Sequence, residues 1–152
     1  EQLYKIVGFY KTQPLVLPAE LEPLNITNPD SVVRNYYFAT EIGGEKINVM
    51  PVLLATGPYD EKKGGRIFDY LQLVFFAVET KGNSSVLVKK DGQYVSYTMQ
   101  QIPDFAGKIG KNTKYIIHAE EILAENFKLM AVKQDVPSPE IIEQMQSVLK
   151  KK

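Results

Sequence analysis

One segment of the chain, residues 118–127, places titratable side chains at helical spacing. It reads His-Ala-Glu-Glu-Ile-Leu-Ala-Glu-Asn-Phe and is rich in strong helix formers. Because an α-helix turns by about 100° per residue, Glu121 and Glu125 lie on one face, with His118 one turn before Glu121. These three side chains are therefore the candidate site residues of the chain.

The same predicted helix, residues 118–132, carries apolar side chains on most of its surface. Leu123, Phe127 and Met130 lie opposite the two glutamates, and this pattern predicts a helix that is buried on two sides. Since an unpaired buried charge is costly, the carboxylates need a partner. That partner could be a cation, a lysine or arginine side chain, or a set of backbone N–H groups.

Structural explanations for each candidate stand beside the chemical one. Glu120 and Glu121 fall in the first turn, where the positive end of the helix dipole favours acidic side chains. Glu125 can pair with Lys128 or with a lysine from another element. His118 can act as a cap or as a hydrogen-bonded structural histidine at the helix start.

The elements before this helix have the patterns of β-strands. A short strand is expected over residues 4–10. Two β-rich runs, 35–42 and 46–55, meet at Gly43-Gly44 and predict a hairpin, with Pro51 favouring an edge or a bulge. After a polar loop over 56–65, the most hydrophobic run, 67–79, predicts the central strand. A second hairpin is expected around Asp91-Gly92.

The last third of the chain predicts helices. A short helix over 100–109 contains Pro103, and a final helix over 139–151 begins at Ser138 and Pro139, a typical N-cap and first position. We therefore expect a single α+β domain over residues 1–152, with an antiparallel sheet of hairpins (about 4–97) followed by three C-terminal helices. The final helix should dock through one apolar face, formed by Ile141, Ile142, Met145, Val148 and Leu149.

Composition excludes several classes of protein. The chain has 152 residues, 44% of them hydrophobic, which suffices for one core. Basic and acidic residues balance at 18 each, so the electrostatic signature of a nucleic-acid binder is absent. There is no cysteine, which excludes disulfides and thiolate zinc sites. The longest apolar stretch, 71–78, is too short to cross a bilayer, so we expect a soluble protein without membrane insertion.

A longer string around the candidate helix carries a family resemblance. Residues 115–127, Tyr-Ile-Ile-His-Ala-Glu-Glu-Ile-Leu-Ala-Glu-Asn-Phe, resemble the helix that supplies the third metal ligand in glutamate-type zinc peptidases, the gluzincins. Residues 51–60 and 64–72 are similar to segments of uncharacterised bacterial proteins that carry the same helix. The resemblance thus covers about residues 48–130 and indicates the C-terminal region of a zinc-metallopeptidase-like family.

The resemblance implies that Glu121 is a zinc ligand and that Glu125 holds a ligand histidine without itself touching the metal. In this group two histidines come from an HExxH helix, and a Glu general base stands beside the metal. This chain has no HExxH and a single histidine, His118, which is a weaker candidate ligand. Any zinc therefore needs ligands outside this chain, from an upstream HExxH-bearing segment, and the chain alone should be catalytically inert.

A second class of function fits the same sequence, namely a non-enzymatic protein-interaction or structural domain. It is favoured by the two hairpins, the proline-rich connections and the incomplete site, and its partner would be a protein bound along an exposed strand edge. Because the first residue is Glu1 and not Met, we expect an N-terminal segment to have been removed. The sequence leaves the compartment open between cytoplasmic and extracytoplasmic.

Overall fold

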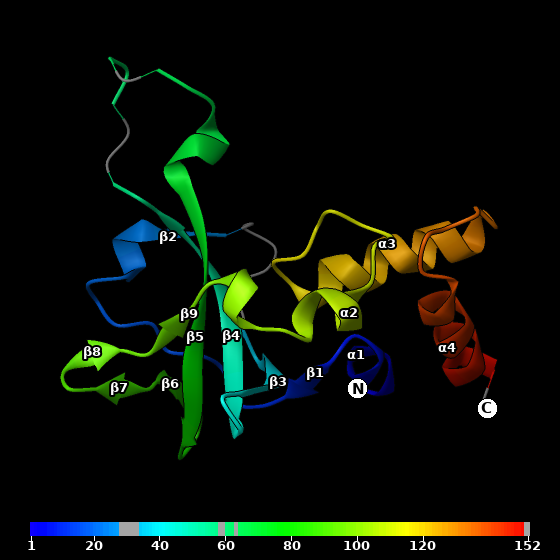
Figure 1. Ribbon diagram of the computed structural model, residues 1–152, viewed down its shortest axis with the longest axis horizontal. Helices are drawn as coiled ribbons and strands as arrows, with labels where there is room; N and C mark the ends of the chain where they lie inside the picture. Colours follow the sequence, from blue (N-terminus) through cyan, green and yellow to red (C-terminus); the bar gives the residue numbers. More distant parts are fainter. Residues whose placement is uncertain (28–33, 58–59, 63, 151–152) are drawn as a thin grey trace.

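The centre of the fold is an antiparallel sheet whose two long strands are buried on both faces. These strands, β4 (Glu45–Ala55) and β5 (Leu71–Lys81), pair along seven consecutive positions. The computed structural model in Figure 1 describes residues 1–27, 34–57, 60–62 and 64–150. Together with its helices, this sheet confirms the predicted α+β class.

The shorter strands complete the sheet around β4 and β5. The main order is β1-β3-β4-β5-β6, with β2 also paired to β4 and β9 to β5, while β7 and β8 form a separate two-stranded ribbon. Their bounds are β1 Phe9–Lys11, β2 Asn25–Ile26, β3 Tyr36–Ile42, β6 Ser84–Leu87, β7 Lys89–Lys90, β8 Gln93–Tyr94 and β9 Ser96–Tyr97.

The helices gather at one end of the molecule, beside the sheet and away from the β7–β8 ribbon (Figure 1). The α-helices are α1 Gln2–Ile6, α2 Phe105–Ile109, α3 Ala119–Ala131 and α4 Pro139–Lys150. Three short 3-10 turns join the elements: η1 Glu22–Leu24, η2 Ile67–Tyr70 and η3 Met99–Gln101.

Both predicted hairpins are present and turn on two residues with positive φ. Gly43 and Gly44 have φ of 62° and 87°, and Ile42 pairs with Glu45 across them. Asp91 and Gly92 have φ of 51° and 79° and connect β7 to β8. Two consecutive left-handed residues give the turn whose twist matches that of the flanking strands.

The sheet has a separate hydrophobic core on each face. Val49 and Phe75 belong to the core beneath the helices, and their neighbours Met50 and Phe76 belong to the opposite core. Successive side chains of a strand point to opposite faces, so continuous apolar runs are what a doubly covered sheet requires. The second core is covered by the N-terminal segment, through Leu15, Leu17, Leu21 and Leu24.

Phe105 fixes the helices to the sheet. Its ring lies edge-to-face against Phe38 and Phe75 of the sheet, with centroids 5.0 and 4.7 Å apart, and it also meets Phe9 at 6.4 Å. Such pairs add to the free energy gained from area burial alone. The hydroxyl of Thr40 donates to the Asp104 carboxylate at 2.6 Å and holds the start of α2 on β3.

The prediction of a strand over residues 4–10 is wrong. Residues 2–6 form α1, and the strand β1 begins only at Phe9, after Gly8 with a φ of 82°. The helix is held by tertiary contacts that the local pattern does not contain. In particular, the ring of Tyr4 stacks on that of Tyr36 with centroids 3.9 Å apart.

The remaining boundaries differ more modestly from the predictions. The central strand starts at Leu71, because η2 occupies the first residues of the expected run. Residues 99–109 divide into η3 and α2 around Pro103, and Leu149 of α4 is exposed and not docked. The final helix is seen to Lys150, and residue 151 lies outside the described residues.

Candidate functional site

Helix α3 positions the candidate residues by burying one of its sides. Ala119, Ile122, Leu123 and Asn126 are buried, at the spacing of a single helical face. The prediction of burial on two sides is wrong, because Phe127 is 51% exposed. The acidic residues therefore lie on a helix that presents its other side to the surroundings.

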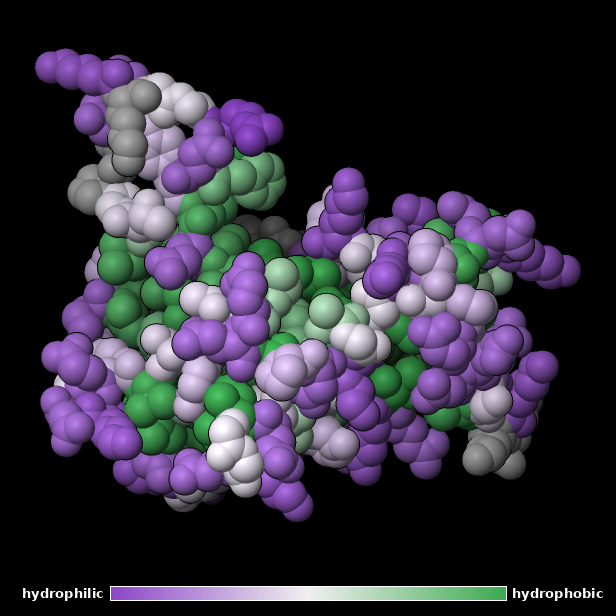
Figure 2. Space-filling model, viewed as in Figure 1, coloured by the Kyte–Doolittle hydropathy of each residue, from purple (hydrophilic) through white to green (hydrophobic). Residues whose placement is uncertain are grey.

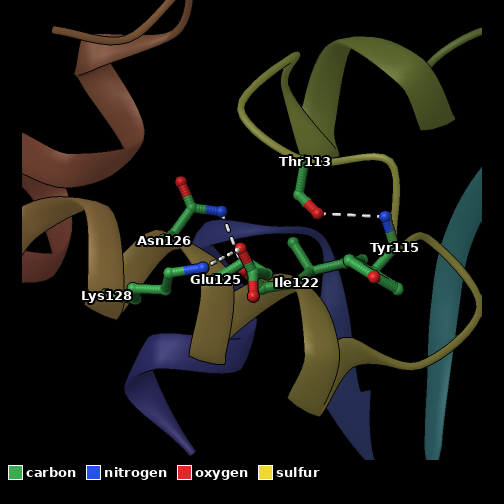
Figure 3. Close-up of polar contacts among 6 residues, drawn as sticks. All are labelled: Thr113, Tyr115, Ile122, Glu125, Asn126 and Lys128. Atoms are coloured by element: carbon green, nitrogen blue, oxygen red, sulfur yellow. Dashed lines mark hydrogen bonds and ion pairs between the residues drawn. The ribbon is translucent and has the colours of Figure 1, made fainter. Parts of the chain in front are cut away.

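Asn126 is the polar residue that holds this helix in place, and the sequence analysis missed it. Its side chain is fully buried, donates to the carbonyl of Ile122 at 2.8 Å, and accepts from the amide of Asn112 at 2.8 Å (Figure 3). Asn112 in turn donates to the Ser138 carbonyl and accepts the Ser138 N–H, each at 2.8 Å. The sequence feature that could have identified it is an asparagine on an otherwise apolar helix face.

Glu121 and Glu125 lie together, as their spacing predicts. With Tyr115 and Ala124 they line a hollow of about 200 Å³ on the open side of α3. Both side chains are half-buried. Glu121 occupies the third position of the helix, and its carboxylate accepts the backbone N–H of His118. This bond is one half of a capping box and fixes the direction of the carboxylate.

The environment of Glu121 raises the pKa of its carboxyl group. Burial raises its pKa above the ordinary value, the bond from the His118 N–H opposes this effect, and the charge of Glu120 raises the pKa further. A cation placed in the hollow would reverse this balance, because it would stabilise the carboxylate. Glu120 and Glu121 do fall in the first turn of α3, where the helix dipole favours acids.

Glu125 pairs with Lys128 on the same helix, which was one of the two explanations offered for it. Their nitrogen and oxygen atoms are 3.4 Å apart, and the lysine side chain is 67% exposed (Figure 3). An exposed pair at this spacing contributes well under about 1 kcal/mol. The contact is therefore weak enough for a competing partner to displace the lysine.

The side chain of His118 lies apart from the carboxylates of Glu121 and Glu125. His118 is the N-cap residue of α3, with extended backbone angles, φ −119° and ψ 138°, so its side chain leaves the helical face. It lines a different hollow, beside Arg34, Pro51 and Glu120. Burial lowers the pKa of His118 from its ordinary value, and the nearby Arg34 lowers it further. The structure thus brings together Glu121 and Glu125 but not His118.

A complete metal site is not formed within the described residues. No three His, Cys, Asp or Glu side chains among them come close enough to hold an ion. Two half-buried carboxylates are oxygen ligands that suit zinc as part of a set of three or four. The residues present fit one contribution to a zinc site and not the whole of it.

Comparisons with known proteins add no further guide. No family model, no curated protein and no solved structure matches the chain. Among the described helices, none has the length and apolar character needed to cross a bilayer. The functional argument therefore depends on the geometry of α3 and its surroundings.

Proposed function

We propose that this chain is one part of a zinc-dependent, peptidase-like hydrolase and contributes Glu121 to a metal site that another segment completes. The remaining ligands would be the histidines of an HExxH helix outside the 152 residues. By itself the chain binds zinc weakly and cleaves nothing, since a catalytic zinc takes three protein ligands and a water.

The observation that carries this proposal is the shared hollow of Glu121 and Glu125 on the open side of α3. A ligand helix that packs over this hollow would meet both carboxylates at once. It would also cover the ring of Tyr115, which lines the same hollow and is 61% exposed. Apolar groups around paired acids are what a helix–helix contact with a polar centre requires.

Each residue has a separate part in this arrangement. Glu121 binds the metal, and the His118 N–H orients the carboxylate through the bond described above. Glu125 exchanges Lys128 for the N–H of a ligand histidine and so fixes the orientation of that imidazole. Zinc, when bound, lowers the pKa of its water and polarises a carbonyl group.

The test is the zinc content of the protein produced together with its encoded upstream segment. We expect stoichiometric zinc in the unchanged protein and a large loss in Glu121→Gln. Glu120→Gln is the matched control, because Glu120 is the neighbouring acid on the same turn and lines a different hollow. Equal zinc content in Glu121→Gln and Glu120→Gln would rule out the assignment.

A non-enzymatic protein-interaction domain is the second candidate, and a different surface favours it. An apolar hollow of about 560 Å³ lies beneath η2, lined chiefly by Pro23, Leu24, Ile26, Ala55, Ile67 and Leu71. Figure 2 shows apolar atoms gathered over this part of the sheet, and nearby Phe68 is 75% exposed. Large exposed apolar patches mark protein contacts.

The expected strand-edge mode of binding is less favoured than this patch. Along the edge of β6, Ser85 donates its N–H to the Pro14 carbonyl at 2.8 Å and accepts from the Val16 N–H at 2.9 Å. The N-terminal segment therefore already covers that edge. The interaction candidate predicts that the longer protein carries no zinc and that Glu121→Gln and Glu120→Gln behave alike.

A further inference from the structure

Among the described residues, the side of β4 that pairs with β2 and β3 has an unpaired stretch at its middle, called the gap below. β3 pairs with β4 as far as Val49, and β2 pairs with it from Leu53, so residues 50–52 have no described partner on that side. Pro51 lies in the gap and still pairs with Phe75 on the other side. Since proline has no N–H, its place on this locally unpaired side of β4 leaves no donor unsatisfied there, which agrees with the expectation of an edge position.

Arg34 lies across this gap on a fixed backbone. Its carbonyl accepts the Leu15 N–H at 2.7 Å, and the carbonyl of the following Asn35 accepts the Thr12 N–H at 2.8 Å. The Nη2 of its guanidinium donates to the Asn25 side chain on β2 at 2.8 Å. The side chain is therefore held in place before any ligand arrives.

The side chain of Arg34 is half-buried, and its guanidinium lacks a full set of partners. Its Nε is enclosed, and no described residue accepts a hydrogen bond from it. Burial lowers the pKa of Arg34, and Glu22 opposes this effect from a distance without forming an ion pair within the described residues. Enclosing an N–H of a charged group without an acceptor is costly, and an anion that accepts from it would remove this cost.

A small hollow of about 20 Å³ opens beside this guanidinium. Its walls include Tyr36 and Pro51 from the sheet and His118 and Ala119 from the start of α3. The helix begins here without a hydrogen bond from an N-cap side chain, so its positive dipole end adds to the charge of Arg34. A cavity needs about 10–15 Å³ of such volume to hold one water molecule, so this hollow has space for one or two oxygen atoms.

We propose that this hollow binds a single carboxylate group, with Arg34 as the residue that holds it. A carboxylate has two oxygens that match the guanidinium fork and fit the available room, whereas a phosphate group is larger. Glu120 lies at the rim and opposes any anion, so Glu120→Gln should tighten binding. The proposal is independent of Glu121 and of zinc.

The test uses the Nε–H signal of Arg34 in NMR spectra of the unchanged chain. The sequence contains two arginines, Arg34 and Arg66, and the side chain of Arg66 is 85% exposed, so it serves as the internal control. On titration with acetate we expect a saturable shift at Arg34 and a weak, unsaturated one at Arg66. Inorganic phosphate at equal ionic strength should give no saturable shift at Arg34.

Two further titrations distinguish the possible sources of the carboxylate and test whether Arg34 is the residue that binds it. If N-acetyl-alanine binds more tightly than acetate and N-acetyl-alanine amide does not bind, the natural ligand is a peptide terminus. If N-acetyl-alanine and acetate bind with equal affinity, the natural ligand is a free small acid. When binding is followed through the backbone amide signal of Ala119, which also lines the hollow, Arg34→Gln should weaken it by about tenfold or more, and Arg66→Gln should not change it. A shift at Arg34 that never saturates, or that matches Arg66, would mean that water alone fills the hollow and would overturn the proposal.

Discussion

Asn126 is a fully buried polar residue on the helix that carries the candidate site. Its amide is fully enclosed and joins α3 to the segment before it through Asn112, which in turn joins the start of α4. A buried amide of this kind is tolerated only when its hydrogen bonds are made. The placement of the acidic face therefore depends on a residue that takes no part in the chemistry.

Replacing Asn126 with leucine should destabilise the fold by about 2 kcal/mol, because the Asn112 side-chain N–H loses its hydrogen-bond acceptor. Urea denaturation gives the free energy of unfolding. Gln144→Leu is the control, since Gln144 is an exposed amide on α4. If the two substitutions had equal effects, the network would not hold α3. A double-mutant cycle with Asn112→Ala would measure the coupling directly.

Tyr4 makes the stability of α1 depend on pH. Burial, the charge of Glu120 and contact with Tyr36 raise the pKa of Tyr4 from 10.0 to about 12. Since the folded state keeps the proton longer than the unfolded state, this contribution is full below pH 10 and is lost as the pH rises towards 12. Because Tyr4 is only partly buried, solvent screening reduces the effect to the order of 1 kcal/mol.

The measurement compares the unchanged chain with Tyr4→Phe, so that the titration of the lysines cancels. We expect the free energy of unfolding of the unchanged chain to fall more steeply than that of Tyr4→Phe as the pH rises from 10 to 12. Parallel pH profiles for the two proteins would show that Tyr4 titrates as it does in the unfolded chain.

Residue-scale prediction from the sequence succeeded where helical geometry alone decides the outcome. Glu121 and Glu125 share a face because they are four apart, and Glu125 finds Lys128 by the same rule. His118 occupies the N-cap position, as one of its two structural explanations had it, and the extended backbone of that position sets its side chain apart from the glutamates. Arg34 had no sequence signal, since the enclosure of its guanidinium depends on tertiary contacts with Asn25 and with residues of β4 and α3.

At the scale of elements, one glycine sets the distance between α2 and α4. Gly110 follows α2 with φ 72° and ψ −166°, a region that other residues avoid. A Cβ added there would lie 2.4 Å from the Cδ1 of Ile141 and 3.0 Å from Ser138. The close approach of α4 to this turn therefore requires the absence of a side chain.

Gly110→Ala should destabilise the fold by about 3 kcal/mol, from backbone strain and overpacking together. Gly107→Ala is the matched control, since that exposed glycine lies within α2 and a Cβ there would meet nothing within 4 Å. It should stabilise the fold by about 0.5–1 kcal/mol. Thermal denaturation of both variants checks the pair. Similar melting temperatures would contradict the packing described for α4.

Elements with strong local signals were predictable, and those that depend on distant contacts were not. The two hairpins followed from Gly43-Gly44 and Asp91-Gly92, whose turn type needs such residues. Residues 2–6 contain no such signal, and their helix is stabilised by Tyr36, far along the sequence. Local pattern cannot register a contact of that kind, which is why this segment was predicted as a strand.

At the scale of the whole molecule, the chain folds around two cores but leaves the acidic side of α3 open. The N-terminal segment and the helices cover both faces of the sheet, whereas Tyr115 remains exposed beside the two glutamates.

The 152-residue chain alone should bind zinc weakly, with far less than one ion per chain after dialysis, and should hydrolyse no peptide substrate. The reason is the count of ligands, since among the described residues no three suitable side chains meet. Elemental analysis of the dialysed chain checks this result. Tight, stoichiometric zinc with peptidase activity would overturn the whole account.

The most direct test is the zinc position in a crystal structure of the protein that includes its encoded upstream segment, located by anomalous scattering. The account predicts one zinc on the open side of α3, with a Glu121 carboxylate oxygen about 2.0–2.2 Å from it and two histidines from the added segment. A zinc bound elsewhere, or a Glu121 carboxylate that contacts the His118 N–H and no metal, would contradict it.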